Sequence, residues 1–276
     1  MTTTRRRING TPDATLAPDD RGLCYGDGLF ETIWLRDGRA PLWPRHMRRL
    51  AEGCRRLGLP APVPAWLLAE VRAAADGLAT AVVRLTLTRG VGPRGYAAPD
   101  PVTPTCIVSA AALPPPRPDW YHQGLRLRVC RTRLAAQPAL AGLKHLNRLE
   151  QVLARNEWHD DSVDEGLMLD LDNRVIGATA ANVFAVRDGR LHTPDLRRCG
   201  VAGTARAEVL ARHPDADVGD LSLDALRAAD EVFLTSAVRG VVPVRALDRH
   251  CWPVGPVTRA IQACWRDAGL PPQVAA

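Results

Sequence analysis

Alternating and continuous apolar segments mark the strands in the first half of the chain. The apolar stretch 29–35 and the alternating stretch 83–87 each predict a strand, the second buried on one face only. The apolar segment 105–112 predicts a third strand. Apolar residues recur at helical spacing from 46 to 57, and Gly58 is suited to end that helix because glycine tolerates a left-handed backbone.

Turn signals and the remaining apolar patterns complete the predicted fold. The tetrapeptide Arg-Asp-Gly-Arg stands at 36–39 and again at 187–190, and Asp-Gly between extended segments predicts a hairpin at each place. Strands and helices alternate without the regular rhythm of parallel βαβ units, which predicts an α/β or α+β fold with mixed sheets. The further expected strands are 125–129, 166–171, 183–186 and 232–235, and the further helices are 146–153, the segment after Gly203, and 257–268.

A run of prolines near the middle of the chain predicts a domain boundary. Residues 114–118 read Pro-Pro-Pro-Arg-Pro. Proline is stiff and extended, and it donates no backbone hydrogen bond. We therefore expect an N-terminal α/β domain over 1–113, a proline-rich linker over 114–122 and a C-terminal α/β domain over 123–276.

Composition narrows the class of protein. With 276 residues, 46% of them hydrophobic, the chain can bury a sizeable core. Its seven cysteines show neither paired nor metal-ligand spacing, which favours buried thiols in a reducing cytoplasm. The basic N-terminus lacks the apolar segment of a secretion signal, and no apolar run is long enough to span a membrane. We expect a cytoplasmic protein with no metal and no membrane partner.

The net charge of +6 allows either nucleic acids or small anionic ligands as partners. The charges are spread along the chain, and three Phe and three Tyr offer little aromatic surface for stacking on bases. The pattern therefore favours a small anionic ligand and no nucleic acid. An arginine-rich nucleic-acid-binding protein is the alternative from another class, and it predicts strongly salt-dependent binding.

Lys144 is the only lysine among 36 basic residues, and all the others are arginines. Arginine stays protonated, whereas lysine can become a neutral amine that attacks carbonyl carbons and forms Schiff bases. Lys144 stands between an extended segment and a helix, where a rigid backbone can direct its side chain into a cleft. The alternative is a surface lysine without function, and the surrounding residues decide between the two.

Three further places carry patterns suited to a phosphate group. Arg49 lies in the predicted helix 46–57 beside apolar residues, while the neighbouring arginines are assigned to a solvated face. The glycine-containing turn 200–206 opens a helix, and free N–H groups at a helix start bind phosphate. Hydroxyl residues follow a strand at 235–237. Together with a Schiff-base lysine, these candidates suggest pyridoxal 5′-phosphate as the cofactor.

At these residues the chain resembles the fold-type IV pyridoxal-phosphate enzymes, which form the class IV aminotransferase family. That family includes branched-chain and D-amino-acid aminotransferases and aminodeoxychorismate lyases. The motif at 25–32, Tyr-Gly-Asp-Gly-Leu-Phe-Glu-Thr, is shared in style by the lyases and the D-amino-acid enzymes. The motifs at 144–151, Lys-His-Leu-Asn-Arg-Leu-Glu-Gln, and at 89–96, Arg-Gly-Val-Gly-Pro-Arg-Gly-Tyr, are similar to the lyases.

The resemblance implies a two-domain fold with the cofactor in the cleft between the domains, and a homodimer. It implies that the C-terminal domain, 123–276, binds the cofactor and that Lys144 holds it covalently. It further implies the lyase activity, which converts 4-amino-4-deoxychorismate to 4-aminobenzoate and pyruvate in folate biosynthesis. The alternative within the family is an aminotransferase acting on D- or branched-chain amino acids. The residues implied to bind the cofactor phosphate are Arg49, Thr204, Ala205, Ser236 and Ala237.

A substrate with two carboxylates needs cationic donors outside the phosphate site. Arginine can bind a carboxylate through two parallel hydrogen bonds. Arg89 and Arg94 lie in a glycine-rich loop and are the candidates, with Thr32 as a possible site hydroxyl. His145 is assigned a structural role, because neighbouring side chains in an extended segment point to opposite faces.

Gly177 departs from the family pattern. The family normally has a glutamate there, in a Val-x-Glu pattern, that pairs with the pyridine nitrogen, and a carboxylate keeps that nitrogen protonated. Its absence implies a weaker electron sink, or a substitute such as water or Thr179. A lyase tolerates a weaker sink better than an aminotransferase, because the formation of an aromatic product drives the elimination.

Overall fold

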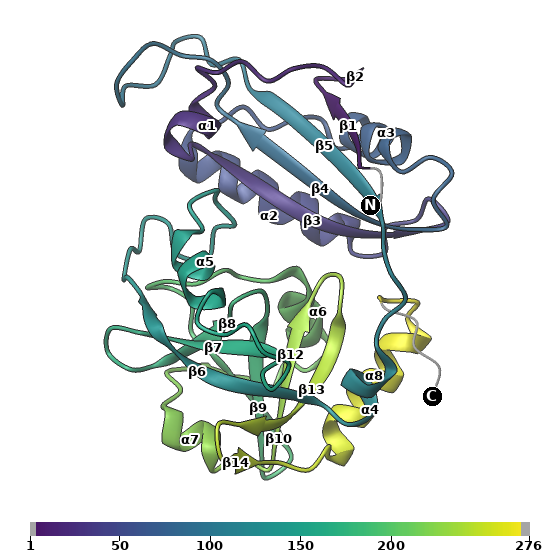
Figure 1. The fold of residues 1–276 in the computed structure, drawn as a ribbon, viewed down its shortest axis with the longest axis vertical. Coiled ribbons are helices and arrows are strands. Elements are labelled where there is room, and N and C mark those ends of the chain that lie inside the picture. Colours follow the sequence, from purple (N-terminus) through teal and green to yellow (C-terminus); the bar gives the residue numbers. More distant parts are fainter. Residues whose placement is uncertain (1–3, 272–276) are drawn as a thin grey trace. The chain divides into compact units, whose positions relative to one another are not determined.

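The computed structural model describes residues 4–271, which divide into two compact units (Figure 1). The first unit holds the residues up to 114 together with 143–147, and the second holds 115–142 and the residues from 148 onward. This division differs from the expected domains in two respects. The expected linker contains a helix, α4 (Pro118–His122), because a proline is tolerated in the first helical turn. The segment around Lys144 belongs to the first unit.

The first unit is built on a five-stranded sheet in the order β2-β1-β5-β4-β3. All of its strand pairs are antiparallel, so the expected mixed pairing does not occur in this sheet. The helix α2 packs against β3 and α3 packs against β5. The strands are β1 (Arg5–Ile8), β2 (Thr11–Pro12), β3 (Gly28–Arg36), β4 (Thr80–Thr88) and β5 (Thr105–Ala112), and the helices are α1 (Arg21–Tyr25), α2 (Trp43–Leu57) and α3 (Pro64–Ala74).

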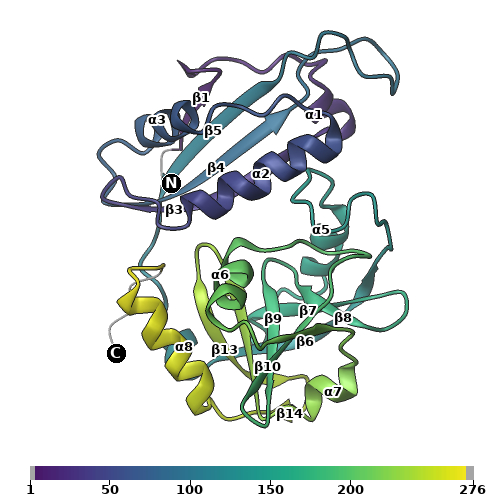
Figure 2. The ribbon, with the colours of Figure 1, turned by 180° about the vertical axis from the view of Figure 1, so that it is seen from behind.

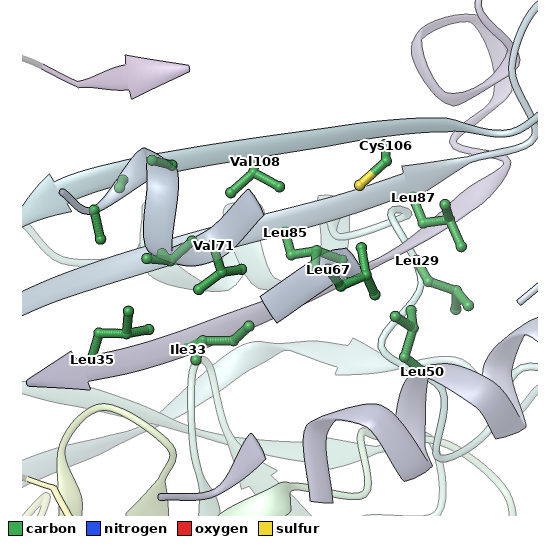
Figure 3. Close-up of a cluster of buried hydrophobic side chains, with 14 of the residues drawn as sticks. Leu29, Ile33, Leu35, Leu50, Leu67, Val71, Leu85, Leu87, Cys106 and Val108 are labelled. Atoms are coloured by element: carbon green, nitrogen blue, oxygen red, sulfur yellow. The ribbon is translucent and has the colours of Figure 1, made fainter. Parts of the chain in front are cut away.

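The core of the first unit lies between this sheet and the helices α2 and α3 (Figure 3). Successive side chains of a strand point to opposite faces, so Leu29 and Ile33 of β3 enter this core. Leu50 of α2 and Leu67 of α3 meet them from the helix side. The residues of β3 and β4 with even numbers face away from the helices, and they include the polar residues Thr32, Arg84 and Thr86.

The two Arg-Asp-Gly-Arg segments adopt similar turns with different outcomes. At 187–190 the turn joins β9 to β10 as a hairpin, as predicted. At 36–39 the backbone of Arg36 pairs with that of Arg39, but the chain then enters α2. Two prolines follow within five residues, at 41 and 44, and they lack the N–H groups that a second strand would need.

The second unit is built on a mixed nine-stranded sheet in the order β11-β10-β9-β12-β13-β6-β7-β8, with β14 beside β13. The pairs β13–β6, β6–β7 and β10–β11 are parallel and the others are antiparallel. The strands are β6 (Leu125–Leu134), β7 (Glu165–Asp170), β8 (Val175–Ala178), β9 (Asn182–Arg187), β10 (Arg190–Pro194), β11 (Asp217–Gly219), β12 (Glu231–Ser236), β13 (Gly240–Leu247) and β14 (His250–Cys251). The further helices are α5 (Leu149–Arg155), α6 (Thr204–Arg212), α7 (Leu223–Arg227) and α8 (Pro256–Asp267).

A buried carboxylate fixes the last helix to this sheet. Helix α8 lies along β12 and β13 (Figure 2). The side chain of Glu231 in β12 accepts hydrogen bonds from the backbone N–H groups of Val257 and Thr258, at 3.0 and 2.7 Å. These N–H groups have no partner inside the helix, and the helix start favours a negative charge. Glycine at 255 is required because a side chain there would collide with Glu231.

Candidate active site

The backbone of Lys144 is fixed along the edge of the first sheet. Phe30 donates a hydrogen bond to the carbonyl of Lys144 at 2.9 Å, and Leu146 donates to the carbonyl of Gly28 at 3.0 Å. Leu143 is buried in the core on the helix side. Because side chains alternate along an extended segment, Lys144 points to the opposite face.

The Lys144 side chain lies against an aromatic ring that a second cation also contacts. Its Nζ is 4.2 Å from the centroid of the Phe30 ring, and Cζ of Arg84 is 4.0 Å from the same centroid. The ring face attracts cations. Thr32 is paired directly opposite Arg84 in the sheet. The structure therefore gathers an amine, a guanidinium and a hydroxyl on one face of the first unit.

Arg49 belongs to a buried charged group on the helix side of the same sheet. Its Nε donates to Glu31 of β3 at 2.8 Å, and its Nη2 contacts the other oxygen of this carboxylate. His46, one turn earlier in α2, lies 2.6 Å from Glu31 through Nδ1. Burial by itself raises the pKa of Glu31, but the charges and hydrogen bonds of Arg49 and His46 outweigh it and lower the pKa to about 2. Glu31 is therefore ionised and orients the Arg49 guanidinium.

Arg89 is occupied by the protein itself. It makes two hydrogen bonds to the carboxylate of Asp27, at 2.8 and 3.1 Å, and two more to the carbonyls of Leu57 and Gly58. Only 8% of its surface is exposed. Since four of the five N–H donors of the guanidinium are used, this geometry supports a structural role. We correct the expectation that Arg89 binds a substrate carboxylate.

Arg94 lies in the exposed part of the same loop. It has no hydrogen bond or ion pair with any of the residues that the structure describes. The loop around it is held by the buried Arg21, which donates to the carbonyls of Gly95 and Tyr96 at 2.9 and 3.1 Å. A fixed loop with an available guanidinium is compatible with binding an anion.

The start of α6 in the second unit forms a cup of backbone N–H groups. Asn182, the first residue of β9, shapes it: its amide nitrogen donates to the carbonyl of Val201 at 2.9 Å, and its oxygen accepts from the N–H of Gly203 at 3.0 Å. A side chain at 203 would collide with Asn182. Thr204 and Ala205 are buried at the first turn of the helix.

The second wall of this cup is the end of β12. Thr235 is paired directly opposite Asn182, and Ser236 and Ala237 follow it. The hydroxyl oxygen of Ser236 accepts a hydrogen bond from the N–H of Arg239 at 3.1 Å. We call the two segments 203–205, at the start of α6, and 235–237, at the end of β12, the phosphate cup.

The phosphate cup contains buried hydroxyl groups that make no hydrogen bond to the described residues. Within residues 4–271, the hydroxyls of Thr204 and Thr235 are buried and have no hydrogen-bond partner. An unsatisfied buried hydroxyl is costly, and the first N–H groups of a helix also lack internal partners. A phosphate group would satisfy both sets, so the residues fit the phosphate of pyridoxal 5′-phosphate.

Position 177 has neither an acid nor room for one. Gly177 is buried in β8 opposite Met168. A Cβ atom there would lie 2.9 Å from the carbonyl oxygen of Ala181, so the turn at 179–181 would have to shift. The Thr179 hydroxyl donates to the carboxylate of Glu165.

Comparison with known proteins decides the family. A family model described as amino-transferase class IV matches residues 28–247. The chain belongs to the class IV aminotransferase family. It is 35% identical over 263 residues to an aminodeoxychorismate lyase of Vibrio harveyi, with 92% of this chain and 97% of the relative covered.

Solved structures of the family share the fold. The chain matches the 4-amino-4-deoxychorismate lyase from Pseudomonas aeruginosa with a TM-score of 0.91 and 51% identity, covering 95% of this chain and 98% of that one. The branched-chain aminotransferase from Escherichia coli matches with a TM-score of 0.82 and 25% identity, covering 95% and 92%. Another branched-chain aminotransferase of this fold was solved with pyridoxamine 5′-phosphate. These neighbours confirm the fold-type IV architecture, and pyridoxal 5′-phosphate is the family cofactor.

Among the described residues, no cluster of His, Cys, Asp and Glu could hold a metal ion, and no helix has the length and apolar character needed to cross a membrane. Four of the seven cysteines are buried, and burial raises the pKa of Cys54 to about 11. The other three cysteines are exposed, contrary to the expectation of buried thiols.

Sequence reasoning missed two residues of this candidate site, Arg84 and Asn182. Arg84 was visible as a polar position in an alternating strand, but only the pairing of β3 with β4 shows that it meets Phe30. Asn182 was visible only as the residue before a strand. Its role depends on a contact with Gly203, 21 residues later in the chain.

Proposed function

We propose that this chain catalyses the aminodeoxychorismate lyase reaction, the conversion of 4-amino-4-deoxychorismate to 4-aminobenzoate and pyruvate in folate biosynthesis. The observation that carries the proposal is the similarity to the lyase from Pseudomonas aeruginosa along nearly the whole chain. The position of the single lysine beside Phe30, and the phosphate cup of the second unit, support it.

The residues of the chain have separate tasks in this proposal. Lys144 holds the cofactor covalently, and the phosphate is bound by the cup residues Thr204, Ala205, Ser236 and Ala237 together with Arg49. When bound, pyridoxal 5′-phosphate withdraws electrons from the substrate carbon that carries the amine nitrogen. Phe30 limits the positions that the Lys144 amine can reach, because it packs against one side of it.

Lys144 also removes a proton from the substrate. Its amine would become free once the substrate amine displaced it from the cofactor, and as a neutral general base it could then accept the proton from the substrate carbon bonded to the amine nitrogen. Loss of that proton and cleavage of the ring C–O bond, whose electron pair leaves with enolpyruvate, give an aromatic ring. Enolpyruvate becomes pyruvate when its methylene carbon takes up a proton. Aromaticity supplies part of the driving force, which fits a site with Gly177 where the family normally has an acid.

Arg84 and Arg94 bind the substrate carboxylates in this reaction. Arg84 makes no hydrogen bond or ion pair with any residue between 4 and 271, and Thr32 stands beside it on the face that carries Lys144. Arg84 replaces Arg89 in this role, since the donors of Arg89 are occupied.

Replacing Arg84 with glutamine is expected to raise KM about 10- to 100-fold, as loss of a charge-assisted contact predicts. The visible absorbance of the bound cofactor should stay. Steady-state kinetics of 4-aminobenzoate formation measure this, with Arg187→Gln, an exposed hairpin arginine, as the control. An unchanged KM in Arg84→Gln would remove Arg84 from the substrate site.

The second candidate is a class IV aminotransferase acting on D- or branched-chain amino acids, which the description of the family favours. The two candidates differ in product. Purified protein is incubated with 4-amino-4-deoxychorismate, and fluorescent 4-aminobenzoate and pyruvate are measured. The same protein is tested with D-alanine or leucine and a keto acid. Amino transfer without 4-aminobenzoate would replace the lyase proposal.

We also propose a homodimer in the cytoplasm that binds a small anionic substrate and no nucleic acid. The helix α5 supports the dimer, because Leu149, Val152 and Leu153 are 77%, 50% and 61% exposed on one helical face. Seven free cysteines support a reducing compartment. Light scattering after gel filtration tests the oligomeric state.

A further inference from the structure

Glu165 is a buried acid that the proposed reaction does not use. It is the first residue of β7 in the second unit and is 4% exposed. One carboxylate oxygen accepts from the hydroxyl of Thr179, and the other accepts from Nη2 of Arg239 at 2.8 Å. Each of its two side-chain partners lies in a different turn.

The turn of Thr179 leads to one wall of the phosphate cup. It spans 179–181 and is fixed to β7, because the N–H of Thr179 donates to the carbonyl of Gly166 at 3.0 Å. The next residue is Asn182, which holds the loop before α6 through Gly203. A movement of this turn would therefore displace the N–H groups at the start of α6.

The turn of Arg239 forms the other wall. It joins β12 to β13, and its first residues are Ser236 and Ala237 of the cup. The backbone N–H of Arg239 is bonded to Ser236, while its carbonyl accepts from the hydroxyl of Tyr121 at 2.9 Å. Both the backbone and the side chain of Arg239 are thus fixed.

We propose that Glu165 is a positioning residue that holds the two walls of the phosphate cup at the spacing that a phosphate monoester requires. It bridges the turn before Asn182 and the turn after Ser236 without belonging to either. A buried carboxylate shared by a guanidinium and a hydroxyl is directional, and breaking one contact leaves a buried charge without its partner. This inference rests on the proposed phosphate role of the cup.

The test compares two ligands that differ only in the phosphate. Apo protein is titrated with pyridoxal 5′-phosphate and with pyridoxal, and the visible absorbance gives a Kd for each. In Glu165→Gln, the Kd for pyridoxal 5′-phosphate should rise about tenfold, and the Kd for pyridoxal should stay nearly constant. A general loss of structure would raise both values together.

Glu157 provides a matched control in the same unit. It is similarly buried, accepts from the Thr132 hydroxyl at 2.8 Å and pairs with Arg128 at 3.5 Å, but bonds to no residue of either cup turn. Glu157→Gln should leave the ratio of the two Kd values at that of the wild type. An equal change of the ratio in both variants would overturn the role of Glu165.

The variants Thr179→Val and Arg239→Gln test the two contacts of Glu165 separately. They also test its positioning role if Glu165→Gln does not fold. Each should raise the Kd for pyridoxal 5′-phosphate selectively, and the double variant should do so by less than the product of the single effects. An unchanged ratio, or a parallel loss of both ligands, would overturn the proposal. If the wild type bound pyridoxal as tightly as pyridoxal 5′-phosphate, the phosphate role of the cup would be wrong. If it formed no 4-aminobenzoate, only the proposed lyase activity would be wrong.

Discussion

The variant Lys144→Ala is expected to lose the visible absorbance of the cofactor and to lower 4-aminobenzoate formation by about 10³-fold or more. Lys144→Arg should be equally inactive, although it keeps the positive charge, because a guanidinium stays protonated and cannot attack a carbonyl carbon. The two variants separate the need for a charge from the need for an amine.

Absorbance spectra of the purified proteins and fluorescence of the product measure these effects. The exposed Arg187→Gln variant should keep the colour and activity of the wild type. A yellow, active Lys144→Arg protein would show that another group holds the cofactor. Since the chain contains no second lysine, that result would contradict both the site and the proposed mechanism.

Glu31→Gln is expected to destabilise the protein by about 3 kcal/mol at neutral pH, the cost of breaking a buried pair. The variant leaves Arg49 and His46 beside a neutral amide in a site where Glu31 is 1% exposed. Urea denaturation of the two proteins measures the difference. Glu52→Gln, which removes an exposed partner of Arg55 on the same helix, should change the stability little.

The stability of the wild type should also depend on Glu31 at acid pH. The folded-state pKa of about 2 lies below the ordinary value of 4.5, so the unfolded chain binds the proton more readily. The contribution of Glu31 is complete above pH 4.5 and is lost as the pH falls toward 2, by about 3 kcal/mol in total. Glu31→Gln should lack this part of the acid transition. Parallel pH profiles in both proteins would contradict the ion pair.

Short sequence patterns correctly predicted the helices, strands and turns whose conformation depends on neighbouring residues. The strand 105–112 was predicted with its observed bounds, and Gly58 ends α2 in a left-handed conformation as its lack of a side chain allows. The helix after Gly203 and the strand before Ser236 were likewise read from short patterns. Periodicity and turn chemistry act over a few residues, so a single sequence carries them.

The missing parts of the site depend on contacts between distant segments. Arg89 and Arg94 look alike in sequence, yet Asp27 and two carbonyls occupy Arg89 and leave Arg94 available among the described residues. In the sequence, nothing distinguishes Glu165 from other strand residues. Its contacts form because β7 lies beside the turns of Thr179 and Arg239. The order of the strands in the sheet decides these contacts, and a local sequence pattern does not encode that order.

The chain returns to the first unit for only five residues, 143–147, so this unit is completed late in synthesis. During synthesis, residues 28–30 of β3 remain an unprotected sheet edge until the segment 143–147 has emerged from the ribosome and Lys144 can pair with Phe30. An exposed edge strand recruits other chains. A truncated fragment that stops at residue 114 would keep that edge permanently, so the first unit is expected to aggregate when it is expressed without the segment that carries the lysine.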